Sequence, residues 1–506
     1  MRSRFLAGIG GLLLLVLAFW QTGLPAGLER LQGRVNDIPY EFIAQTGHLD
    51  GSRPLVLIGH GYAGSAVIMR GFAYTLAQAG YVAALWDFDG HGANSNPLPS
   101  GLPRNRLLSN AEAVWGEAQG LGIGDGSRTA ILGHSMGSGV ALEFGVRYPQ
   151  ARATIAVSPV LSPVTLDLPQ NLLLMAGQNE PGFQKNARIL FEQATGQSAS
   201  PLSSSTINLV TGNVRRLIIV PWVEHVSIVF SPFAHHAARQ WLDAVIGRQP
   251  GALDYTDTRI LWYVIGLTGM LLACLCLVPG TRPALLAAQF SRGRRFLALT
   301  GAAISATLLL QLLDRLGLDL SGFLGLQMGG YLLVWFAIAG LLALALLYNR
   351  AEPGGTQPWS WLRLPSWSAV WPGLLVAAFL WVGMGLLGGQ VWLPWLLIPV
   401  RLRLLPLAFA CLLPWSLAVG QVTSPAHPLG RAGWWLAHSL ILLISLFFAI
   451  ELNPQLRFLG LILPLFPIIL AVQAIAAGRQ RHFWAYAFSA APFLAWVILA
   501  VFPLSG

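Results

Sequence analysis

Charge is scarce in this chain of 506 residues. Only 10% of the residues are Asp, Glu, Lys or Arg, whereas soluble domains usually hold about 25%. Hydrophobic residues make up 55%, and the mean hydropathy is +0.60. A chain that is water-soluble throughout is therefore not expected.

Acidic residues are almost absent outside residues 26–258. That window holds 15 Arg and Lys against 17 Asp and Glu, whereas the rest of the chain holds 16 Arg against four acids. The net charge of +10 thus comes from the flanks of apolar segments. A nucleic-acid-binding protein would need basic residues gathered on a soluble face, and the sequence has no such cluster.

Cysteine is rare, and its placement excludes a disulfide framework in the soluble part. The three cysteines are Cys274, Cys276 and Cys411, all in apolar stretches. Cys274 and Cys276 lack the two-residue spacer of a redox or zinc pair. We expect all three to pack as small apolar residues between helices, and no motif implies a metal or an organic cofactor.

Long apolar runs are what the chain has in abundance. Residues 5–20 form the first, behind Arg2 and Arg4, and their length suits a signal-peptide core or a short spanning helix. Residues 23–27 make a poor cleavage site, which favours an uncleaved signal anchor over residues 1–25.

A second series of apolar runs follows Thr258 and predicts a membrane domain of about eight helices over residues 259–506. Residues 391–400 are too short to span a bilayer and suggest an interfacial or re-entrant piece. The eight runs are residues 260–278, 296–313, 323–348, 369–387, 404–419, 434–450, 458–477 and 483–502.

The arginines between these runs predict the orientation of the chain. With the N-terminus in the cytoplasm, eleven arginines fall on the inner side: Arg2, Arg4, Arg282, Arg292, Arg294, Arg295, Arg350, Arg363, Arg431, Arg479 and Arg481. Four fall on the outer side: Arg315, Arg401, Arg403 and Arg457. The positive-inside rule then predicts a multi-pass protein of the bacterial inner membrane, with residues 26–258 in the periplasm.

Short apolar strands alternate with helices in the soluble segment. This alternation predicts one domain with a mainly parallel sheet, covered by helices on both faces. Residues 33–42 suggest an antiparallel leading pair. The predicted strands are residues 55–58, 81–88, 129–132, 154–157, 172–176 and 217–221, and the predicted helices are residues 67–79, 106–119, 140–148, 183–195 and 231–246.

The most informative motif in the soluble segment is Gly-His-Ser-Met-Gly at residues 133–137, between a strand and a helix. Strand, G-x-S-x-G and helix together are the pattern of a nucleophile elbow. Small residues allow a turn tight enough to present the hydroxyl of Ser135, and the N–H of Met136 then points to where an oxyanion would form.

From about residue 54 to 247 the chain resembles the α/β-hydrolase superfamily, in its serine aminopeptidase, monoacylglycerol lipase and dienelactone hydrolase-like branch. The C-terminal half carries no such resemblance. The matching motifs, in the family's order, are His60-Gly61, Asp87-Phe88-Asp89-Gly90-His91-Gly92, Gly133 to Gly137, Gly177-Gln178-Asn179-Glu180 and Glu224-His225-Val226-Ser227.

The resemblance implies a catalytic triad on three of these motifs. Ser135 would be the nucleophile and His225 its base, because a serine hydroxyl needs a base within hydrogen-bond reach. Glu180 stands where this branch commonly carries Asp, and its carboxylate would hold the imidazole. Backbone N–H groups of Met136 and Tyr62 would form the oxyanion hole.

Other residues compete for two of these roles. His134, His60, His91, His235 and His236 are the alternatives to His225. Asp167 and Asp89 are the alternatives to Glu180, whereas Glu224, adjacent to His225, is poorly directed for this role. The turn at residues 87–92 is expected to be structural.

Only residues 160–170 separate two of the predicted strands, too few for a large cap domain. The Ser- and Thr-rich residues 198–213 and the membrane domain are the two candidates to cover the pocket. Polar residues in or near the apolar runs are either functional or interhelical partners: His438, Gln311, Gln327, Gln473, Asp314 and Glu451.

Together these features predict an integral membrane serine hydrolase that cleaves carboxylic esters through an acyl-serine intermediate, without a cofactor. Its expected partners are membrane lipids and an acyl-ester or lipid-like substrate, not nucleic acid, and the oligomeric state stays open. Two alternatives remain: an acyltransferase that modifies an envelope lipid or glycan, and a transporter or sensor that uses the hydrolase fold for binding.

Overall fold

The computed structural model describes residues 2–99, 104–198, 203–208, 213–282, 290–348, 365–423 and 427–506. Its internal contacts divide the chain into two compact units. The sheet unit comprises Thr22–Trp262 with Gly389–Pro394 and Pro503–Gly506. The helical unit comprises Met1–Gln21, Tyr263–Gly388 and Trp395–Phe502.

Among the described residues, the sheet unit holds one nine-stranded sheet in the order β1-β2-β4-β3-β5-β6-β7-β9-β8. Its six middle strands, from β4 to β9, pair in parallel, while β1, β2 and β8 pair antiparallel at the two ends. The strands are β1 (Leu28–Val35), β2 (Ile38–Gln45), β3 (Pro54–Gly59), β4 (Val82–Trp86), β5 (Asp125–His134), β6 (Ala153–Val157), β7 (Leu172–Gly177), β8 (Ser203–Asn208) and β9 (Asn213–Val220).

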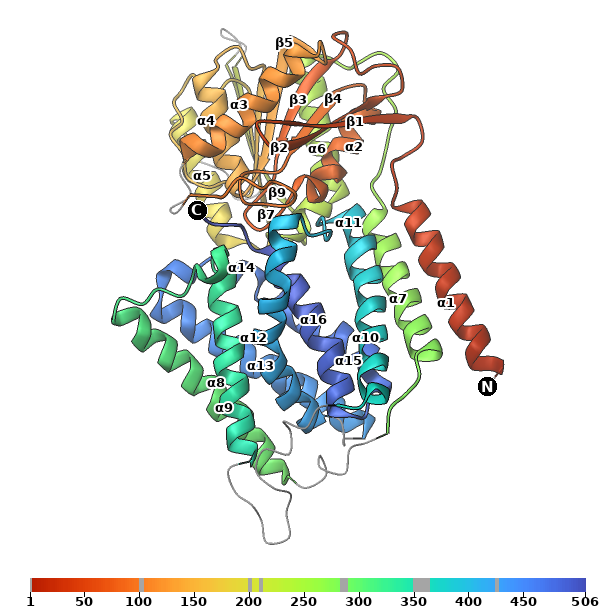
Figure 1. Ribbon diagram of the computed structural model, residues 1–506. Helices are drawn as coiled ribbons and strands as arrows, with labels where there is room; N and C mark the ends of the chain where they lie inside the picture. The colour runs from red at the N-terminus through yellow and green to blue at the C-terminus, as the bar shows by residue number, and fades with distance from the viewer. Residues whose placement is uncertain are drawn as a thin grey trace. The chain divides into compact units, whose positions relative to one another are not determined.

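Helices cover both faces of this sheet (Figure 1). On strand β3, Val56 and Ile58 point into the core beneath α2 and α6, whereas Leu55 and Leu57 point into the core beneath α3 and α4. Side chains alternate along a strand, so a strand buried on both faces must be apolar throughout. The five helices are α2 (Arg70–Gln78), α3 (Arg104–Gly120), α4 (Met136–Arg147), α5 (Pro181–Thr195) and α6 (Pro232–Ile246). The predicted mainly parallel sheet is confirmed.

The parallel register brings the carboxyl ends of the central strands to one edge. Gly59 of β3 lies beside Gly133 of β5, and Gly177 of β7 lies beside Val220 of β9. Open α/β sheets bind their ligands outside the carboxyl ends of the strands. The loops after β3, β5, β7 and β9 therefore meet where a site is expected.

The sequence predicts that no cap domain lies over this edge of the sheet and that a loop at residues 198–213 is one candidate to cover it. The structure confirms the first prediction and contradicts part of the second. Residues 158–171, between β6 and β7, contain neither helix nor strand, which confirms that no cap domain is inserted there. The expectation of a covering loop at residues 198–213 is wrong for Ser203–Asn208, which forms edge strand β8 paired with β9. Backbone pairing along an open sheet edge overrides the loop-like composition of this segment. Residues 199–202 and 209–212 lie outside the described residues.

The helical unit contains most of the helices that are long and apolar enough to cross a membrane. Among the described residues, eight segments of the chain meet this criterion: Arg2–Gln21, Arg259–Leu277, Arg292–Arg315, Gly329–Tyr348, Trp367–Val391, Pro399–Thr423, Leu429–Leu452 and Phe483–Val501. They correspond to α1 (Arg2–Gln21), α7 (Arg259–Leu277), α8 (Arg292–Arg315), α9 (Gly329–Tyr348), α10 (Trp367–Leu380) continued through a π-helical turn to α11 (Gly388–Val391), α12 (Pro399–Thr423), α13 (Pro428–Leu452) and α16 (Phe483–Val501). A multi-pass membrane protein is thereby indicated.

Two details differ from the predicted runs. The run at residues 458–477 is divided into α14 (Leu459–Ile462) and α15 (Leu465–Ala476), with Pro464, which has no N–H to continue a helix, in the break. Helix α12 begins at Pro399, five residues before the expected start, so part of the predicted interfacial piece belongs to a long helix.

Close helix packing in this unit depends on small residues. Helix α12 packs against both α9 and α16, and a Cβ on Gly340 of α9 would lie 2.1 Å from the backbone nitrogen of Trp415 on α12. Small residues of this kind let helix backbones approach where hydrophobic driving force between helices is weak.

Candidate active site

Ser135 lies at a sharp turn between β5 and α4. Its backbone has φ 52° and ψ −117°, a conformation that costs free energy for any residue except glycine. The two flanking glycines make the turn possible: a Cβ on Gly133 would lie 2.0 Å from the carbonyl oxygen of Gly137, and one on Gly137 would lie 2.6 Å from that of Gly59. The local structure is the strained strand-to-helix turn of a nucleophile elbow.

Three side chains from distant parts of the sequence form a hydrogen-bonded chain. The distance from Ser135 Oγ to His225 Nε2 is 3.0 Å, and that from His225 Nδ1 to Glu180 Oε2 is 2.9 Å. A carboxylate only accepts, so Nδ1 of His225 carries the proton and Nε2 is left to accept from the serine hydroxyl. All three residues are buried.

Glu180 is held by more than its contact with the imidazole. Its second oxygen, Oε1, accepts hydrogen bonds from the hydroxyl of Ser158, at 2.7 Å, and from the backbone N–H of Gly177. These contacts orient a side chain that is one methylene longer than Asp. Ser158, which follows β6 and has a positive φ of 46°, was not among the residues that we expected from the sequence.

The imidazole of His225 lies between two other rings. Phe183 of α5 stacks on it with ring centres 4.1 Å apart, and the ring of His134 lies 4.9 Å away. His134 Nε2 also lies 2.9 Å from the backbone oxygen of His225, so this nitrogen carries a proton and donates. Burial, followed by the proximity of His225, holds the pKa of His134 well below its usual value, so the ring stays neutral beside the candidate base. Sequence reasoning missed Phe183.

The loop that follows β3 is anchored by His60. Its Nε2 accepts a hydrogen bond from the N–H of Phe88 at 3.0 Å, so Nδ1 carries the proton and donates to the oxygen of Gly61 at 2.7 Å. Burial lowers the pKa of His60 to about 4. Fixing the carbonyl of Gly61 also fixes the direction of the Tyr62 N–H across the same planar peptide.

Met136 provides the other expected oxyanion contact. It is the first residue of α4, and the first N–H groups of a helix have no partner within the helix. Helix N-termini also favour negative charge. The assignment of Met136 and Tyr62 to an oxyanion hole stays a prediction.

Asp87 connects two loops next to this edge. Its Oδ1 accepts from the N–H of Ala66 and its Oδ2 from the N–H of Ala93, each at 2.7 Å, and burial raises its pKa to about 6. Within the sheet unit, Leu504 also pairs with this region, because its N–H donates to Gly90 and its oxygen accepts from Leu98. The expectation of a structural turn agrees with these contacts, whereas the pairing with Leu504 was not foreseen.

The competing acids lie in other surroundings. Asp89 forms an ion pair with Arg106 at 2.6 Å, and Asp167 is exposed. Glu224 accepts from the N–H groups of Val226 and Ser227, which stabilises the turn that carries His225.

The competing histidines also have other surroundings. The ring of His91 packs against those of His60 and Tyr62. On α6, His235 is buried with its Nε2 2.8 Å from the oxygen of Val229, and His236 lies near Thr256. Within the ranges that the structure describes, no three His, Cys, Asp or Glu side chains come close enough to hold a metal ion.

The parallel sheet and the serine at its nucleophile elbow define the α/β-hydrolase fold. Residues 50–203 match the sequence model of the serine aminopeptidase family, S33. The sheet unit therefore has the α/β-hydrolase fold.

Two uncharacterized proteins of Mycobacterium tuberculosis are similar in sequence. Rv2715 is 34% identical over 100 residues, which are 20% of this chain and 27% of that protein. Rv2307c is 27% identical over 186 residues, 35% of this chain and 64% of that protein. The chain thus matches about a quarter of the first relative and less than two thirds of the second.

Two solved structures are similar to the chain in fold. One is a bacterial membrane phospholipase A, with 15% identity and a TM-score of 0.34, covering 47% of this chain and 93% of that one. The other is a soluble variant of the monoglyceride lipase of Saccharomyces cerevisiae, with 16% identity and a TM-score of 0.30, covering 44% of this chain and 96% of that one.

Proposed function

We propose that this chain is a membrane-anchored serine hydrolase that cleaves carboxylic esters, and that the acyl group passes through Ser135. The observation that carries the proposal is the unbroken chain of hydrogen bonds from Ser135 Oγ through His225 to Glu180, placed on a strained elbow at the carboxyl edge of the sheet. The arrangement satisfies the geometric test for an activated nucleophile, since base and nucleophile lie within hydrogen-bond reach and a third group orients the base.

The reaction follows from these positions. Ser135 Oγ attacks the ester carbonyl while His225 Nε2 takes its proton, and the negative charge on the carbonyl oxygen is stabilised by the N–H groups of Met136 and Tyr62. Each such donor contributes about 3 kcal/mol to transition-state stabilisation. The C–O bond then breaks, and the imidazolium returns the proton to the leaving alkoxide. His225 then takes a proton from a water molecule, whose oxygen attacks the acyl carbonyl. The bond to Ser135 Oγ breaks, the imidazolium returns the proton to Oγ, and the free acid leaves.

A shallow surface depression follows β6. Leu161, Ser162, Pro163 and Val164 border it together with Gln193 of α5. The segment is fixed near the elbow because the N–H of the preceding Val160 donates to Ser138 Oγ at 3.0 Å. The helices of the same chain that are apolar enough to span a membrane favour a lipid-derived ester as substrate.

The test is hydrolysis of acyl esters of graded chain length by the full-length protein in detergent micelles. Ser135→Ala should lose at least about 10³-fold of the activity, whereas Ser127→Ala, an exposed serine earlier on β5, should retain it. A preference for long chains supports the lipid-derived substrate, and a preference for short chains contradicts it. If excess alcohol converts the product from acid to ester, the acyltransferase is the better account.

We further propose that the hydrolase domain lies on the periplasmic side of a bacterial inner membrane, as the distribution of arginines predicts. Reporter fusions after residue 258 test this orientation. An alkaline phosphatase fusion should be active there and a green fluorescent protein fusion dark. The reverse pattern would contradict the proposed orientation without affecting the proposed chemistry.

A further inference from the structure

Trp222 is the most exposed large hydrophobic side chain among the described residues, at 84%. The next two are Leu429, at 80%, and Trp20, at 76%, and both lie in segments that are apolar enough to span a membrane. Trp222 lies instead in the sheet unit, in the loop that follows β9. It therefore has the exposure of a lipid-facing side chain although it belongs to no spanning segment.

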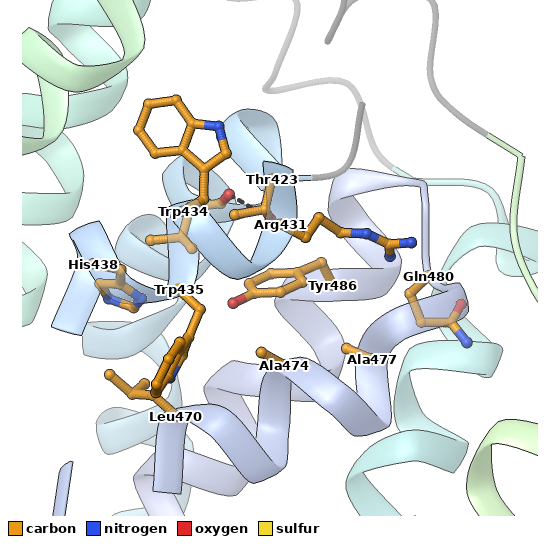
Figure 2. Close-up of a pocket in the computed structure, with 11 residues that line it drawn as sticks. Thr423, Arg431, Trp434, Trp435, His438, Leu470, Ala474, Ala477, Gln480 and Tyr486 are labelled. Atoms are coloured by element: carbon orange, nitrogen blue, oxygen red, sulfur yellow. Dashed lines mark hydrogen bonds between the residues drawn. The ribbon is translucent and has the colours of Figure 1, made fainter. Parts of the chain in front are cut away.

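The tryptophans of α13, in contrast, are covered by their neighbours. Figure 2 shows Trp434 and Trp435 among the residues that line a small pocket of the helical unit. Both are half-buried, and Nε1 of Trp435 donates to the oxygen of Pro467 at 3.1 Å. The exposure of Trp222 is thus not a general property of tryptophan in this chain.

The backbone around Trp222 is fixed by hydrogen bonds. Its φ of 63° is a left-handed conformation that is unfavourable for a bulky side chain. The N–H of Trp222 donates to Oε1 of Gln178 at 3.1 Å, and the N–H of Gln178 donates to the oxygen of Val220 at 2.8 Å. Strained positions of this kind persist where the surroundings hold them, and they gather at functional sites. His225 of the proposed triad follows three residues later.

A second exposed aromatic ring lies at the same edge of the sheet. Phe233 is 51% exposed and belongs to the first turn of α6. Because α6 follows β9, its first turn lies at the carboxyl edge, where β9 ends. Pro221 and Pro232, both exposed, directly precede the two rings. We call these four residues the aromatic rim: Pro221, Trp222, Pro232 and Phe233.

The opposite edge of the sheet carries exposed charges. Arg147 ends α4, Arg152 precedes β6 and Arg248 follows α6, and all three are exposed. Leu121 is also exposed there, but single apolar side chains are common on protein surfaces. At the aromatic rim Glu224 is exposed, and its carboxylate accepts from two backbone N–H groups. The carboxyl edge is therefore the better suited of the two to lipid.

Short links keep the sheet unit beside the membrane that the apolar helices cross. Residues 22–27 separate α1 from β1, and residues 247–258 separate α6 from α7. Both α1 and α7 are long and apolar enough to span a bilayer, so some surface of the sheet unit stays next to lipid head groups. Tryptophan is enriched at this level because its ring is apolar and its N–H is polar.

We propose that the aromatic rim docks on the surface of the lipid bilayer, with the rings of Trp222 and Phe233 at the level of the head groups. The carboxyl edge of the sheet, which carries Ser135, then faces the lipid. Docking itself does not depend on hydrolysis. The supply of a lipid-derived ester to Ser135 along this surface rests on the proposed function.

Spin labels on the full-length protein in phosphatidylcholine–phosphatidylglycerol nanodiscs test the docking. The label is attached at Trp222→Cys, at Phe233→Cys or, as the matched control, at Leu121→Cys on the opposite edge. Collision rates are measured with oxygen, which concentrates in lipid, and with nickel-EDDA, which stays in water. The native cysteines are replaced by alanine: Cys274, Cys276 and Cys411.

At positions 222 and 233 the ratio of oxygen to nickel collisions should shift toward oxygen relative to position 121. Nickel collisions as frequent as those at position 121 would place the rim in water and overturn the proposal. Rare collisions with both reagents would show that protein covers the rim, from this chain or a second copy, and would overturn it as well. The label at position 233 keeps the test decisive if Trp222→Cys does not fold.

Trp222→Asn tests the effect of the ring on substrate supply. Asparagine tolerates the left-handed backbone, so this variant removes the ring and keeps the loop. Hydrolysis of a long-chain ester in proteoliposomes should fall by about 10- to 100-fold relative to Leu121→Asn, the partition factor of one large apolar side chain. Hydrolysis of a short, water-soluble ester should change by less than about 2-fold.

Equal losses on the two esters would contradict a role of Trp222 in docking and assign the residue to the fold or the chemistry. A protein that passes the spin-label test and cleaves neither ester would refute the proposed function and leave the docking surface in place. Failure of the one proposal is thus distinguished from failure of the other.

Discussion

The phenyl ring of Phe183 lies flat against the imidazole of His225, with ring centres 4.1 Å apart and planes inclined by 18°. Phe183 comes from the first turn of α5, directly after the segment that carries Glu180. One turn of the chain thus supplies both the carboxylate at the edge of the imidazole and the ring on its face. Orientation of the candidate base depends on both contacts.

Replacement of Phe183 by leucine should lower kcat by about 2- to 10-fold, because stacked aromatic pairs contribute about 0.5–1.5 kcal/mol beyond their buried area. KM should change less if the ring only positions His225. Phe233→Leu, at an exposed phenylalanine of α6, is the control. Steady-state ester hydrolysis by both variants measures the effect. An unchanged kcat in Phe183→Leu would show that the phenyl ring does not help to orient His225.

Replacement of Glu180 by glutamine keeps the shape of the side chain and removes its charge. Activity should fall by about 10²- to 10⁴-fold, because the amide no longer stabilises an imidazolium and no longer selects its tautomer. The activity of Glu180→Asp should fall by about 10- to 100-fold, because the shorter side chain holds its carboxylate farther from Nδ1 of His225. Full activity of Glu180→Gln would show that another acid supports His225.

The loop that carries Tyr62 should not tolerate a side chain at position 61. A Cβ on Gly61 would lie 2.9 Å from His134 Nδ1 and 3.1 Å from the Cβ of Ser135. Gly61→Ala should therefore displace the loop and lower kcat by about 10- to 100-fold. Gly116→Ala on α3, where a Cβ meets nothing within 4 Å, should keep full activity. Equal activities of the two variants would contradict the role given to this loop.

Acid should destabilise the sheet unit through its buried histidines. Burial lowers the pKa of His235 to about 4, below the unfolded value of about 6.5. Between these values the unfolded chain binds the proton and the folded chain does not, so stability falls as the pH drops from about 6.5 to 4. For His235 the loss is about 3 kcal/mol.

His235→Gln isolates this effect, because its amide can still donate to the oxygen of Val229 without titrating. Asp87, whose pKa is raised, changes the stability in the opposite direction over part of this pH range. The informative quantity is therefore the difference in stability between His235→Gln and the unsubstituted protein. Thermal unfolding of both at pH 7 and pH 4.5 should show a smaller drop in Tm for His235→Gln. Parallel pH dependences would show that His235 does not contribute.

The elbow and the residues of the proposed triad could be predicted from the sequence because each depends on local structure. The glycines around Ser135 allow only a narrow turn, and Glu180 and His225 follow strands that end at the same sheet edge. Parallel pairing then brings these side chains together although His225 lies 90 residues after Ser135.

Ser158, Phe183 and Leu504 could not be found in this way. Their contacts depend on how loops and helices pack, and a serine after a strand or a phenylalanine on a helix has no motif of its own. Edge strand β8 was missed for a related reason, since its Ser-rich composition is typical of a loop and only pairing with β9 makes it a strand. The single run predicted at residues 458–477 did not allow for Pro464, although a proline inside a helix removes a backbone hydrogen bond and breaks the helix.

The most direct test of the central claim is the site of covalent labelling by a fluorophosphonate. Peptide mapping of the labelled full-length protein should place a single adduct on Ser135. The adduct should be absent from Ser135→Ala and should form at least about 10²-fold more slowly in His225→Gln, which lacks the base. An adduct on another residue, or an equal rate of labelling in His225→Gln, would contradict a serine activated by His225.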